Sequence, residues 1–334
     1  MTEKPSLIVL TPVRNEAWVL DAFLAATSLW ADRIILADQM STDGSREIAQ
    51  KYPKVTLVDN QSATMHQANA RMLLFKEADK IEGEKVLFCL DADEFLSGDF
   101  MQTDTWKSML TVGDRCVAYC LKWVNVWGDL NHRIADESSH AEWIGYFPKG
   151  RMVADLYASR EKNAVHESRL PCLPESEMDY VIVDDIRLIH LARYNPNRQE
   201  AKKMFYMVST VRDRNAVSAV SINRLYRLHA NESPATGEVA DEMYAYYTNH
   251  SVCLEKMVLR SDGLFVDYVV DIIAKEGPGK YVSLDIWWWP ELNKRFGDPR
   301  PLRWKMLHRY LRKSDAHRSS IVVRAIDKIL KKIC

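Results

Sequence analysis

"FCLDADEF", residues 88–95, joins an apolar run directly to three acidic residues that are crowded within four positions. The apolar part is typical of a buried strand, and the acidic residues follow where that strand ends. Carboxylates packed this closely repel one another unless solvent or a cation screens them. We therefore expect a positive charge beside Asp91, Asp93 and Glu94.

The first hundred residues of the chain, which contain this stretch, alternate two spacings of apolar side chains. Short apolar runs that end in polar or turn residues occupy residues 6–12, 33–38, 54–59 and 85–91. The segments between them carry apolar residues every three to four positions, which is the spacing of a helix. Strand and helix in alternation predict an α/β fold with a mostly parallel sheet covered by helices on both faces. Ligands of such sheets bind beyond the carboxyl ends of the strands, where Asp38, Asp59 and Asp91 stand.

Beyond residue 95 this alternation ends. Residues 116–127 and 180–192 have the composition of longer strands, and from residue 195 onward the pattern is mainly helical. We place a domain boundary near residue 232, within "NESPATGE". The sequence thus predicts an α/β domain over residues 1–232 and a helical region over residues 233–334.

Charge is unevenly distributed along the chain. The net charge is -1, yet residues 293–334 hold 13 lysines and arginines against three aspartates, a net of +10, which leaves about -11 for residues 1–292. We expect no nucleic acid as a partner, because no zinc-finger or RNA-recognition signature accompanies the basic tail. A surface of anionic lipid is the simpler candidate for this tail.

The basic tail has two segments with a basic amphipathic helical pattern, residues 301–313 and 319–334. The second segment places four apolar residues along one face: Val322, Ile326, Ile329 and Ile333. Two interpretations are open. Such helices lie on a membrane surface, or they form a cap that packs on the catalytic domain with its charges in water.

Two observations bear on localisation. No apolar run approaches the roughly 18 residues of a membrane span, and the first residues lack the pattern of a secretory signal peptide. We therefore expect a cytoplasmic protein, which is peripheral on the inner face of the cytoplasmic membrane if the tail binds lipid.

The pair Asp91 and Asp93 has the chemistry of a metal site. Two carboxylates at a strand's end can hold Mg²⁺ or Mn²⁺ through oxygen and leave coordination positions open for phosphate oxygens. The metal would neutralise charge that builds on a diphosphate leaving group. The alternative is that these acids only cap the following turn. Because no Gly-x-Gly-x-x-Gly follows the first strand and no phosphate-binding loop with Gly-Lys-Ser/Thr is present, a metal-held nucleoside diphosphate is the better hypothesis.

Other strand ends carry candidate contacts for a nucleoside. Asp38 ends its strand, where its carboxylate can accept a hydrogen bond from the imide N–H of uracil. After the first strand, Thr11, Arg14 and Glu16 can face the nucleoside. Asp43 suits the N-cap of the next helix better than a ligand contact, because Gly and Ser follow it.

Three segments in this order and spacing make the pattern specific: "TPVRNEAWVLDAFLAA", "ILADQMSTDGSREIA" and "VLFCLDADEF". They resemble the nucleotide-binding half of family 2 glycosyltransferases with the GT-A fold. Similarity to the lipopolysaccharide-core type continues through residues 163–170 and 187–206, so that the resemblance covers about residues 5–210. It implies a metal-dependent, hexosyltransferase-type enzyme of bacterial cell-surface glycan synthesis. Such an enzyme moves a sugar, with inversion, from a nucleotide-sugar such as a UDP-sugar to a hydroxyl of a saccharide or lipid-linked acceptor.

The resemblance also implies roles for single residues. Asp38 would hold the base, Asp91 the ribose or metal side, and Asp93 the metal. Relatives often have Gln-Lys-Asn before the fourth strand, whereas this chain has Ala68 at the lysine position. We expect Arg71, one helical turn further on, to supply the positive charge to phosphate.

The tripeptide "VHE" places an imidazole beside a carboxylate. His166 can complete the ligand set of the metal, and Glu167 can take the proton from the acceptor hydroxyl as it attacks the sugar. A surface hydrogen bond between the two is the alternative. His190 is the rival metal ligand, or else a buried histidine of its strand, and Asp184 and Asp185 are further candidates for the base.

Two other functions fit parts of the sequence. A haloacid-dehalogenase-like phosphohydrolase also places a nucleophilic Asp after an apolar strand, but that family expects Thr or Val where Glu94 stands. A non-catalytic, membrane-associated relative is the second alternative. The presence of all four expected site acids argues against it: Asp38, Asp91, Asp93 and Glu167.

Overall fold

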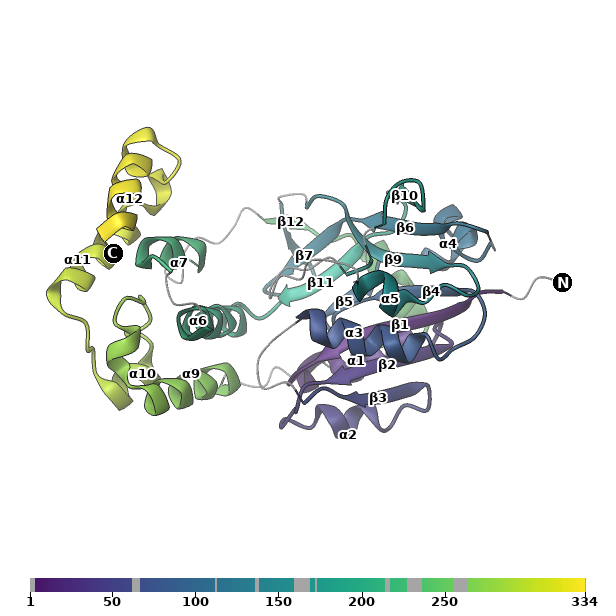
Figure 1. Cartoon of the computed structure of the whole chain (residues 1–334), viewed down its shortest axis with the longest axis horizontal. Coiled ribbons are helices and arrows are strands. Elements are labelled where there is room, and N and C mark those ends of the chain that lie inside the picture. The colour runs from purple at the N-terminus through teal and green to yellow at the C-terminus, as the bar shows by residue number, and fades with distance from the viewer. Residues whose placement is uncertain are drawn as a thin grey trace. The chain divides into compact units, whose positions relative to one another are not determined.

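The chain divides into two compact units in the computed structural model (Figure 1). The first consists of residues 1–194 and 235–259, and the second of residues 195–234 and 260–334. The structure describes residues 4–61, 67–111, 113–135, 138–158, 169–171, 173–213, 217–226, 236–254, 257 and 263–333. The predicted boundary near residue 232 differs from this division. The described residues 195–213 and 217–226 belong to the second unit and residues 236–254 to the first, because local spacing does not reveal which core a segment joins.

The first unit is built on a seven-stranded sheet in the order β10-β6-β9-β4-β1-β2-β3. Its mutually parallel strands are β1 (Ser6–Val13), β2 (Arg33–Asp38), β3 (Val55–Asp59) and β4 (Lys85–Cys89). The helices that connect them are α1 (Ala17–Ser28), α2 (Ser45–Ala49) and α3 (Gln67–Ala78). The sheet is completed by β6 (Cys116–Leu121), β9 (Ala141–Phe147) and β10 (Met178–Ile182), of which β9 runs antiparallel to both its neighbours. The predicted α/β fold with a mostly parallel sheet is confirmed.

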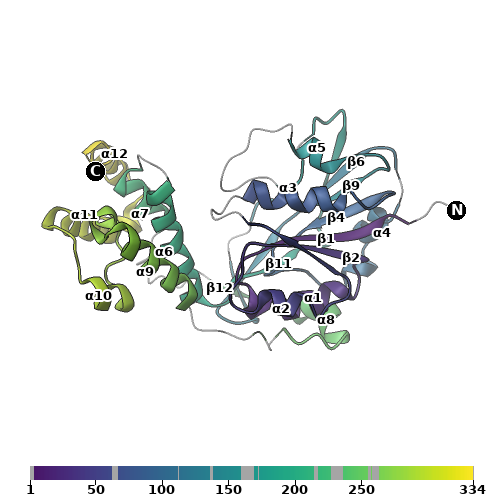
Figure 2. The same ribbon diagram turned by 60° about the horizontal axis from the view of Figure 1, so that its bottom comes forward.

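Side chains of β1 alternate between two hydrophobic layers. Leu7 and Val9 pack in the layer that contains α1, while Ile8 and Leu10 pack in the layer that contains α3 and α5 (Val153–Ala158). Figure 2 shows α3 on one side of the sheet and α1 and α2 on the other. Because both faces are covered, every position of such a strand is apolar until the strand reaches its polar end.

A second sheet has five strands in the order β12-β8-β7-β11-β5. Its strands are β5 (Glu94–Leu96), β7 (Trp123–Trp127), β8 (His132–Ile134), β11 (Leu188–Arg193) and β12 (Thr236–Glu238). The prediction of single long strands over 116–127 and 180–192 is wrong, since β6 passes into β7 and β10 passes into β11. Each division coincides with polar residues, at Lys122 in one strand and at Asp184 and Asp185 in the other.

These divisions position the site, because they carry the chain from one sheet into the other. As a result β11 pairs in antiparallel orientation with β5, the short strand that begins at Glu94 of the acidic stretch. His190 of β11 lies opposite Glu94. Shorter helices complete the first unit: η1 (Phe100–Gln102), α4 (Asp104–Met109), η2 (Asp241–Tyr244) and α8 (Ala245–Asn249).

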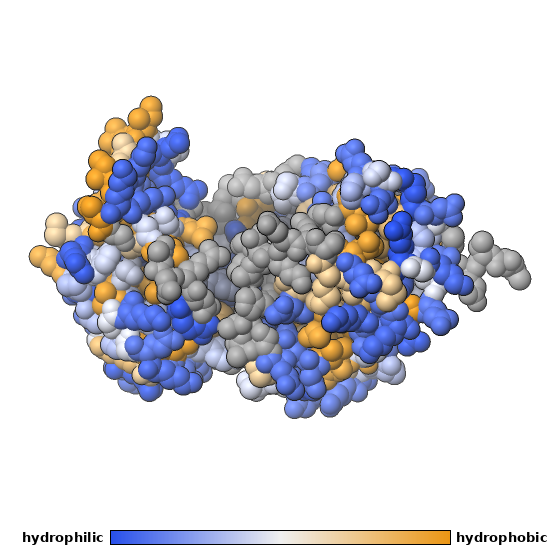
Figure 3. All heavy atoms as spheres, viewed as in Figure 1, coloured by the Kyte–Doolittle hydropathy of each residue, from blue (hydrophilic) through white to orange (hydrophobic). Residues whose placement is uncertain are grey.

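The second unit is helical, as predicted. Its elements are α6 (Pro196–Asp213), α7 (Ala219–Tyr226), α9 (Gly263–Glu276), η4 (Pro278–Tyr281), α10 (Pro290–Phe296), α11 (Leu302–Ser314), η5 (Asp315–His317) and α12 (Ile321–Ile333). Figure 3 shows hydrophobic atoms at the surface of the part that Figure 1 labels α12. Throughout the part of the chain that the structure describes, each helix is too short or too polar to cross a bilayer.

Candidate active site at the carboxyl edge of the sheet

The ends of the parallel strands meet at one edge of the central sheet. The strand register pairs Val13 with Asp38, Asp38 with Asp59, and Leu10 with Cys89. The acidic residues that terminate β2, β3 and β4 therefore lie along the same edge, as the sequence predicts.

Hydrogen bonds join the loop after β1 to the loop after β2. The backbone N–H of Asn15 donates to Ser41 Oγ over 2.9 Å, and Asn15 Oδ1 accepts from the backbone N–H of Thr42 over 2.7 Å. Asn15 has a φ of 58°, a left-handed conformation that asparagine adopts more readily than most residues. The rim of the site is thus held by contacts between two loops that are distant in sequence.

Asp43 anchors the starts of two helices. Its carboxylate accepts the backbone N–H of Ala17, the first residue of α1, over 2.9 Å. It also accepts the backbone N–H of Ser45, the first residue of α2, over 3.0 Å. The predicted N-cap is displaced by one residue, because Gly44 is the N-cap of α2. The Asp43 carboxylate nevertheless binds the start of α2 and also the start of α1, which the sequence did not indicate.

The three candidate residues that follow the first strand differ in their surroundings. Thr11 is fully buried, and its hydroxyl has no hydrogen-bond partner among the residues described. Arg14 is half-buried in the loop, and Glu16 accepts a 2.6 Å hydrogen bond from Trp18 Nε1. The structure places all three at or next to the carboxyl end of β1.

Asp38 presents a buried acceptor at this edge. Its side chain is 1% exposed, and Oδ2 accepts hydrogen bonds from Arg46 Nη1 (2.8 Å) and from the backbone N–H of Ser41 (3.2 Å). Oδ1 is buried without a partner in the described part of the chain. An unsatisfied buried acceptor costs about 1–3 kcal/mol, so a donor supplied by a ligand would be favoured there.

Arg46 links two of the strand ends. The same Nη1 that binds Asp38 lies 2.8 Å from Asp59 Oδ1. Hydrogen bonds to these two carboxylates raise the pKa of Arg46 above its usual value. Sequence reasoning missed this arginine, although its position two residues after Gly44 at the start of α2 is compatible with an approach to the edge.

Arg169 supplies a positive charge to the acidic stretch. Its Nη1 and Nη2 donate to the two carboxylate oxygens of Glu94, over 2.6 and 2.9 Å, and Nη2 also donates to Asp91 Oδ2 over 2.8 Å. The guanidinium stacks 3.9 Å from the ring centre of Trp143. Charge crowding predicted a cation here, but not which residue would provide it, because Arg169 is distant in sequence.

Glu94 is completely buried, and both its carboxylate oxygens accept hydrogen bonds. Besides Arg169, its oxygens accept from Trp123 Nε1 (2.9 Å) and from the backbone N–H of Asp91 (2.8 Å). Burial raises the pKa of Glu94 to about 7, Arg169 opposes that shift, and the nearby charges of Asp91 and Asp93 add to it. Glu94 therefore acts as the structural centre of the turn, with no oxygen directed to solvent.

Asp93 and His190 are brought together by the pairing of β5 with β11. Asp93 is 5% exposed, and its Oδ1 lies 3.9 Å from His190 Nε2. His190 Nδ1 is 2.8 Å from Asn125 Oδ1, and the ring stacks on Trp123 at 4.8 Å between centroids. Because Asn125 Oδ1 accepts, the Nδ1 of His190 donates this hydrogen bond, and Nε2 is the ring nitrogen that faces the Asp93 carboxylate.

The remaining candidate residues are His166, Glu167, Asp184 and Asp185. His166 and Glu167 lie outside the described residues, so their roles stay predictions. Asp184 lies 3.4 Å from His140, and Asp185 accepts hydrogen bonds from Thr105, so the contacts of these two candidates are with residues outside the cluster. Among the residues that the structure describes, no group of three or more His, Cys, Asp or Glu is arranged to hold a metal ion.

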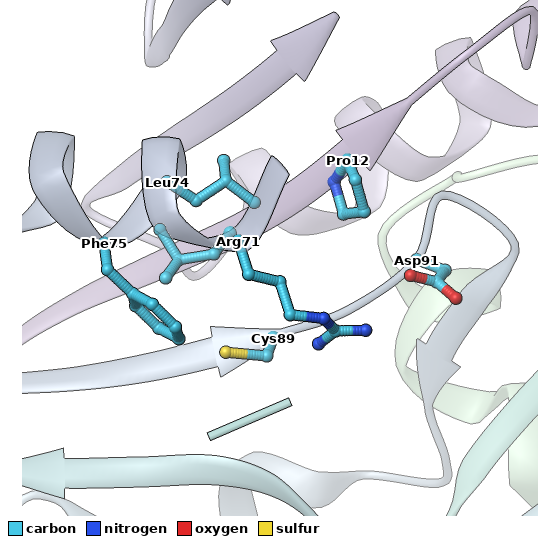
Figure 4. Close-up of a pocket in the computed structure, with 7 residues that line it drawn as sticks. Pro12, Arg71, Leu74, Phe75, Cys89 and Asp91 are labelled. Carbon is cyan, nitrogen blue, oxygen red and sulfur yellow. The ribbon is translucent and has the colours of Figure 1, made fainter. Parts of the chain in front are cut away.

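Arg71 lines a small pocket beside the acidic cluster. The pocket is formed by Leu10, Pro12, Arg71, Leu74, Phe75, Cys89 and Asp91. Figure 4 shows the Arg71 guanidinium extending from α3 past Cys89 in the direction of Asp91. Arg71 is 6% exposed, and its Nε lacks a hydrogen-bond partner within the ranges described.

Arg71 and Arg169 bring two guanidiniums close to each other beside this pocket, which Asp91 also lines. Burial lowers the pKa of Arg71, repulsion from Arg169 adds to the shift, and Asp91 opposes it. Burial also raises the pKa of Cys89 to about 12, so its thiol carries no compensating negative charge near neutral pH. Ala68, at the lysine position of the resemblance, is buried and uncharged, and Arg71 lies one helical turn further along α3.

The sheet order, the covering helices and the acidic carboxyl edge define an α/β protein with a mostly parallel central sheet, the architecture expected of a GT-A fold, with an added helical region. Residues 8–132 match the sequence model described as "Glycosyl transferase family 2". The match spans β1 to β4, β5 and the acidic stretch. It favours the glycosyltransferase over the phosphohydrolase alternative.

Several solved structures are similar to the chain at low identity. The inositol-1-phosphate CTP transferase from T. maritima is 11% identical, with 57% of this chain and 90% of that chain covered and a TM-score of 0.36. A 4-diphosphocytidyl-2C-methyl-D-erythritol synthase is 11% identical, with coverage of 55% and 91% and a TM-score of 0.37.

A glycosyl-transferring enzyme is also among these structures. Glucosyl-3-phosphoglycerate synthase from Mycobacterium tuberculosis, in complex with Mn²⁺, UDP and glucosyl-3-phosphoglycerate, is 18% identical. The similarity covers 34% of this chain and 43% of that chain, with a TM-score of 0.27. No curated protein matches the sequence.

Proposed function

We propose that this protein is an inverting glycosyltransferase that takes a sugar from a UDP-sugar and transfers it to a hydroxyl of a saccharide or lipid-linked acceptor in bacterial cell-surface glycan synthesis. The observation that carries the proposal is the family 2 segment itself, whose strands end on Asp38, Asp91 and Asp93 at one edge of the sheet. An acidic edge of this kind suits a nucleotide-sugar donor that binds together with metal cations.

Asp38 is the proposed contact to the base. Its buried Oδ1 would accept the imide N–H of uracil, while Arg46 holds the other oxygen. Cytosine carries an acceptor at the corresponding ring nitrogen, and two acceptors facing each other repel. The arrangement therefore supports a uridine donor over a cytidine donor.

Arg71 is the proposed contact to the diphosphate. It is buried beside Asp91, with one donor unused among the residues described, so a phosphate oxygen would satisfy the donor and compensate the buried charge. Thr11, Arg14 and Glu16 would line the nucleoside side of the same edge.

A divalent cation, Mg²⁺ or Mn²⁺, fits the pair of Asp93 and His190. Asp93 and His190 turn a carboxylate oxygen and an imidazole nitrogen toward each other, and a cation between them would be attracted to both atoms. We propose Asp93 as ligand, with Asp91 on the metal or ribose side and either His190 or His166 completing the set. Such a cation would stabilise the negative charge of the departing diphosphate.

Glu167 is the proposed general base. It would remove the proton of the acceptor hydroxyl while the hydroxyl oxygen bonds to the anomeric carbon. The bond from that carbon to the diphosphate oxygen breaks at the same time, and UDP departs with the electron pair. Attack from the face opposite the leaving group inverts the anomeric configuration.

Calorimetry of UDP binding with and without Mn²⁺ tests the metal-linked part of the proposal. Mn²⁺ should strengthen UDP binding to the natural protein, and this effect should vanish in Asp93→Asn. Asp99→Asn is a matched control, because Asp99 is an exposed acid shortly after the same strand. If Mn²⁺ strengthens UDP binding equally in Asp93→Asn, Asp93 has no place in the site.

Comparison of UDP with CDP tests the role of Asp38. The natural protein should prefer UDP, and Asp38→Asn should lose most of that preference because an amide can both donate and accept. An unchanged preference would remove Asp38 from the base site. Failure of both nucleotides to bind the natural protein would overturn the proposed donor class.

A further inference from the structure

One side of helix α12 is committed to packing within the second unit. Val323 is 9% exposed, and Leu330 packs against a cluster formed by residues of α7 and α11. Asp327 accepts hydrogen bonds from Arg224 Nε (2.9 Å) and from the Tyr310 hydroxyl (3.0 Å). These contacts fix the rotation of α12 about its own axis.

A different side of α12 presents an apolar stripe to solvent. Its members follow the spacing of three to four residues that keeps side chains on one helix face. The exposed fractions are 68% for Val322, 38% for Ile326, 63% for Ile329 and 72% for Ile333. Because packing uses Val323 and Leu330 instead, this stripe is not the side that holds the helix in place.

Basic residues accompany the stripe. The helix carries four of them, namely Arg324, Lys328, Lys331 and Lys332. Its only acid is Asp327, whose charge is paired with Arg224. Helix α11 has the same character, since Leu302 and Met306 are 72% and 63% exposed and five of its thirteen residues are Lys or Arg.

We propose that α12 docks on a membrane surface of anionic lipid, with the stripe Val322, Ile326, Ile329 and Ile333 in the interfacial region and the basic side chains at the headgroups. An apolar stripe together with basic residues on the rest of the helix surface matches the two components of interfacial helix binding, apolar burial and attraction to negative lipid. A second copy of the chain is a poorer occupant, because two such helices would bring like charges together. The inference goes beyond the proposed transferase activity and does not depend on it.

Flotation of the full-length chain with vesicles tests the proposal. Vesicles of phosphatidylcholine with one quarter phosphatidylglycerol should carry the protein, and vesicles of phosphatidylcholine alone should carry much less. Val322→Ser/Ile329→Ser should weaken binding by roughly tenfold or more, since each substitution removes several buried CH₂ or CH₃ groups. Both positions are exposed, so the fold should tolerate the change.

A charge-reversal pair separates lipid attraction from general loss of charge. Lys328→Glu/Lys332→Glu should abolish most binding, because each basic residue near an anionic surface contributes severalfold in affinity. Lys80→Glu/Lys107→Glu changes the net charge equally at positions 69% and 63% exposed in the first unit, and it should bind nearly as well as the natural protein. For the apolar pair, Ile182→Ser is the control, at a first-unit position that is 58% exposed.

Three outcomes would overturn the proposal. The full-length protein fails to bind anionic vesicles at low and at physiological salt, or the α12 variants bind as well as their controls. Alternatively, sedimentation shows a dimer that Val322→Ser/Ile329→Ser dissociates while vesicle binding is absent, which would assign the stripe to a second copy of the chain.

Discussion

Arg169 binds both carboxylate oxygens of Glu94, over 2.6 and 2.9 Å, although 75 positions separate the two residues in the sequence. The same guanidinium also binds Asp91, so Arg169 links two acids of the turn that follows β4. It leaves the Asp93 carboxylate facing His190. The ion pair thus holds Glu94 inside the protein, while Asp93 faces His190.

Substitution Arg169→Met should be strongly destabilising. Glu94 is fully buried, and loss of one partner of a buried ion pair typically costs about 3–5 kcal/mol. Urea unfolding would measure this as a lower free energy of unfolding. Arg169→Met/Glu94→Gln should recover part of the loss, because the uncompensated buried charge is removed. Equal stability of the single variant and the natural protein would contradict the structural role of the pair.

Substitution Arg71→Met should weaken UDP binding much more than uridine binding. Uridine lacks the diphosphate, so the ratio of the two affinities isolates the contact to phosphate. A charge-assisted hydrogen bond contributes about 1.5–3 kcal/mol, which corresponds to roughly ten- to a hundredfold in UDP affinity. Titration calorimetry with both ligands is the measurement. Equal losses for UDP and uridine would indicate that Arg71 only supports the fold of the pocket.

Substitution Glu167→Gln should reduce kcat by about 10²- to 10⁴-fold while UDP-sugar binding is retained. Glutamine keeps the shape of the side chain but cannot accept the proton of the acceptor hydroxyl. His166→Ala should instead weaken the metal-linked component of donor binding if that histidine is a ligand. A kcat close to normal in Glu167→Gln would move the base to another acid, and a product that retains the donor's anomeric configuration would contradict single displacement.

The second unit should lose stability as the pH falls below about 6.5. His308 is 1% exposed, with Nε2 3.0 Å from the Ser283 carbonyl oxygen and Nδ1 2.9 Å from Arg300 Nη1. Burial lowers the pKa of His308, and Asp285 opposes the shift. Below the ordinary pKa the unfolded chain binds a proton that the folded chain does not, so protons favour unfolding.

Urea unfolding between pH 5 and pH 8 measures this dependence. His308→Gln keeps a donor for the carbonyl but cannot titrate, so its unfolding free energy should fall less toward low pH than that of the natural protein. The difference between the two slopes should not exceed about 1.4 kcal/mol per pH unit, the limit for one proton. Parallel curves for the two proteins would contradict the assignment.

The first four strands and their helices could be predicted from the sequence because the information is local. Each strand of the parallel sheet is buried on both faces, so it is an unbroken apolar run, and its end is marked by an acid such as Asp38 or Asp91. The placement of Asp43 at the entry to α2 was also local, since it depends on the residues directly after it. The parallel register then carries the acids to one edge.

The division of the two long strands could not be predicted in the same way. Residues 116–127 are apolar on either side of Lys122, and the pattern alone does not distinguish one long strand from two strands in different sheets. That difference depends on which neighbour each half pairs with. The pairing of β11 with β5, which brings His190 beside Asp93, follows from it.

The sequence by itself determined the α/β class, the match of residues 8–132 to the family 2 model and the acidic edge, because period, strand ends and motif order are properties of neighbouring residues. Only the tertiary structure decided that Arg169 would neutralise Glu94, that Arg46 would hold Asp38, and that α12 would turn a second apolar stripe outward. Each of these depends on a partner from another element. Such partners are chosen by packing and by the need to compensate buried charge, and neither is recorded in the spacing of residues along the chain.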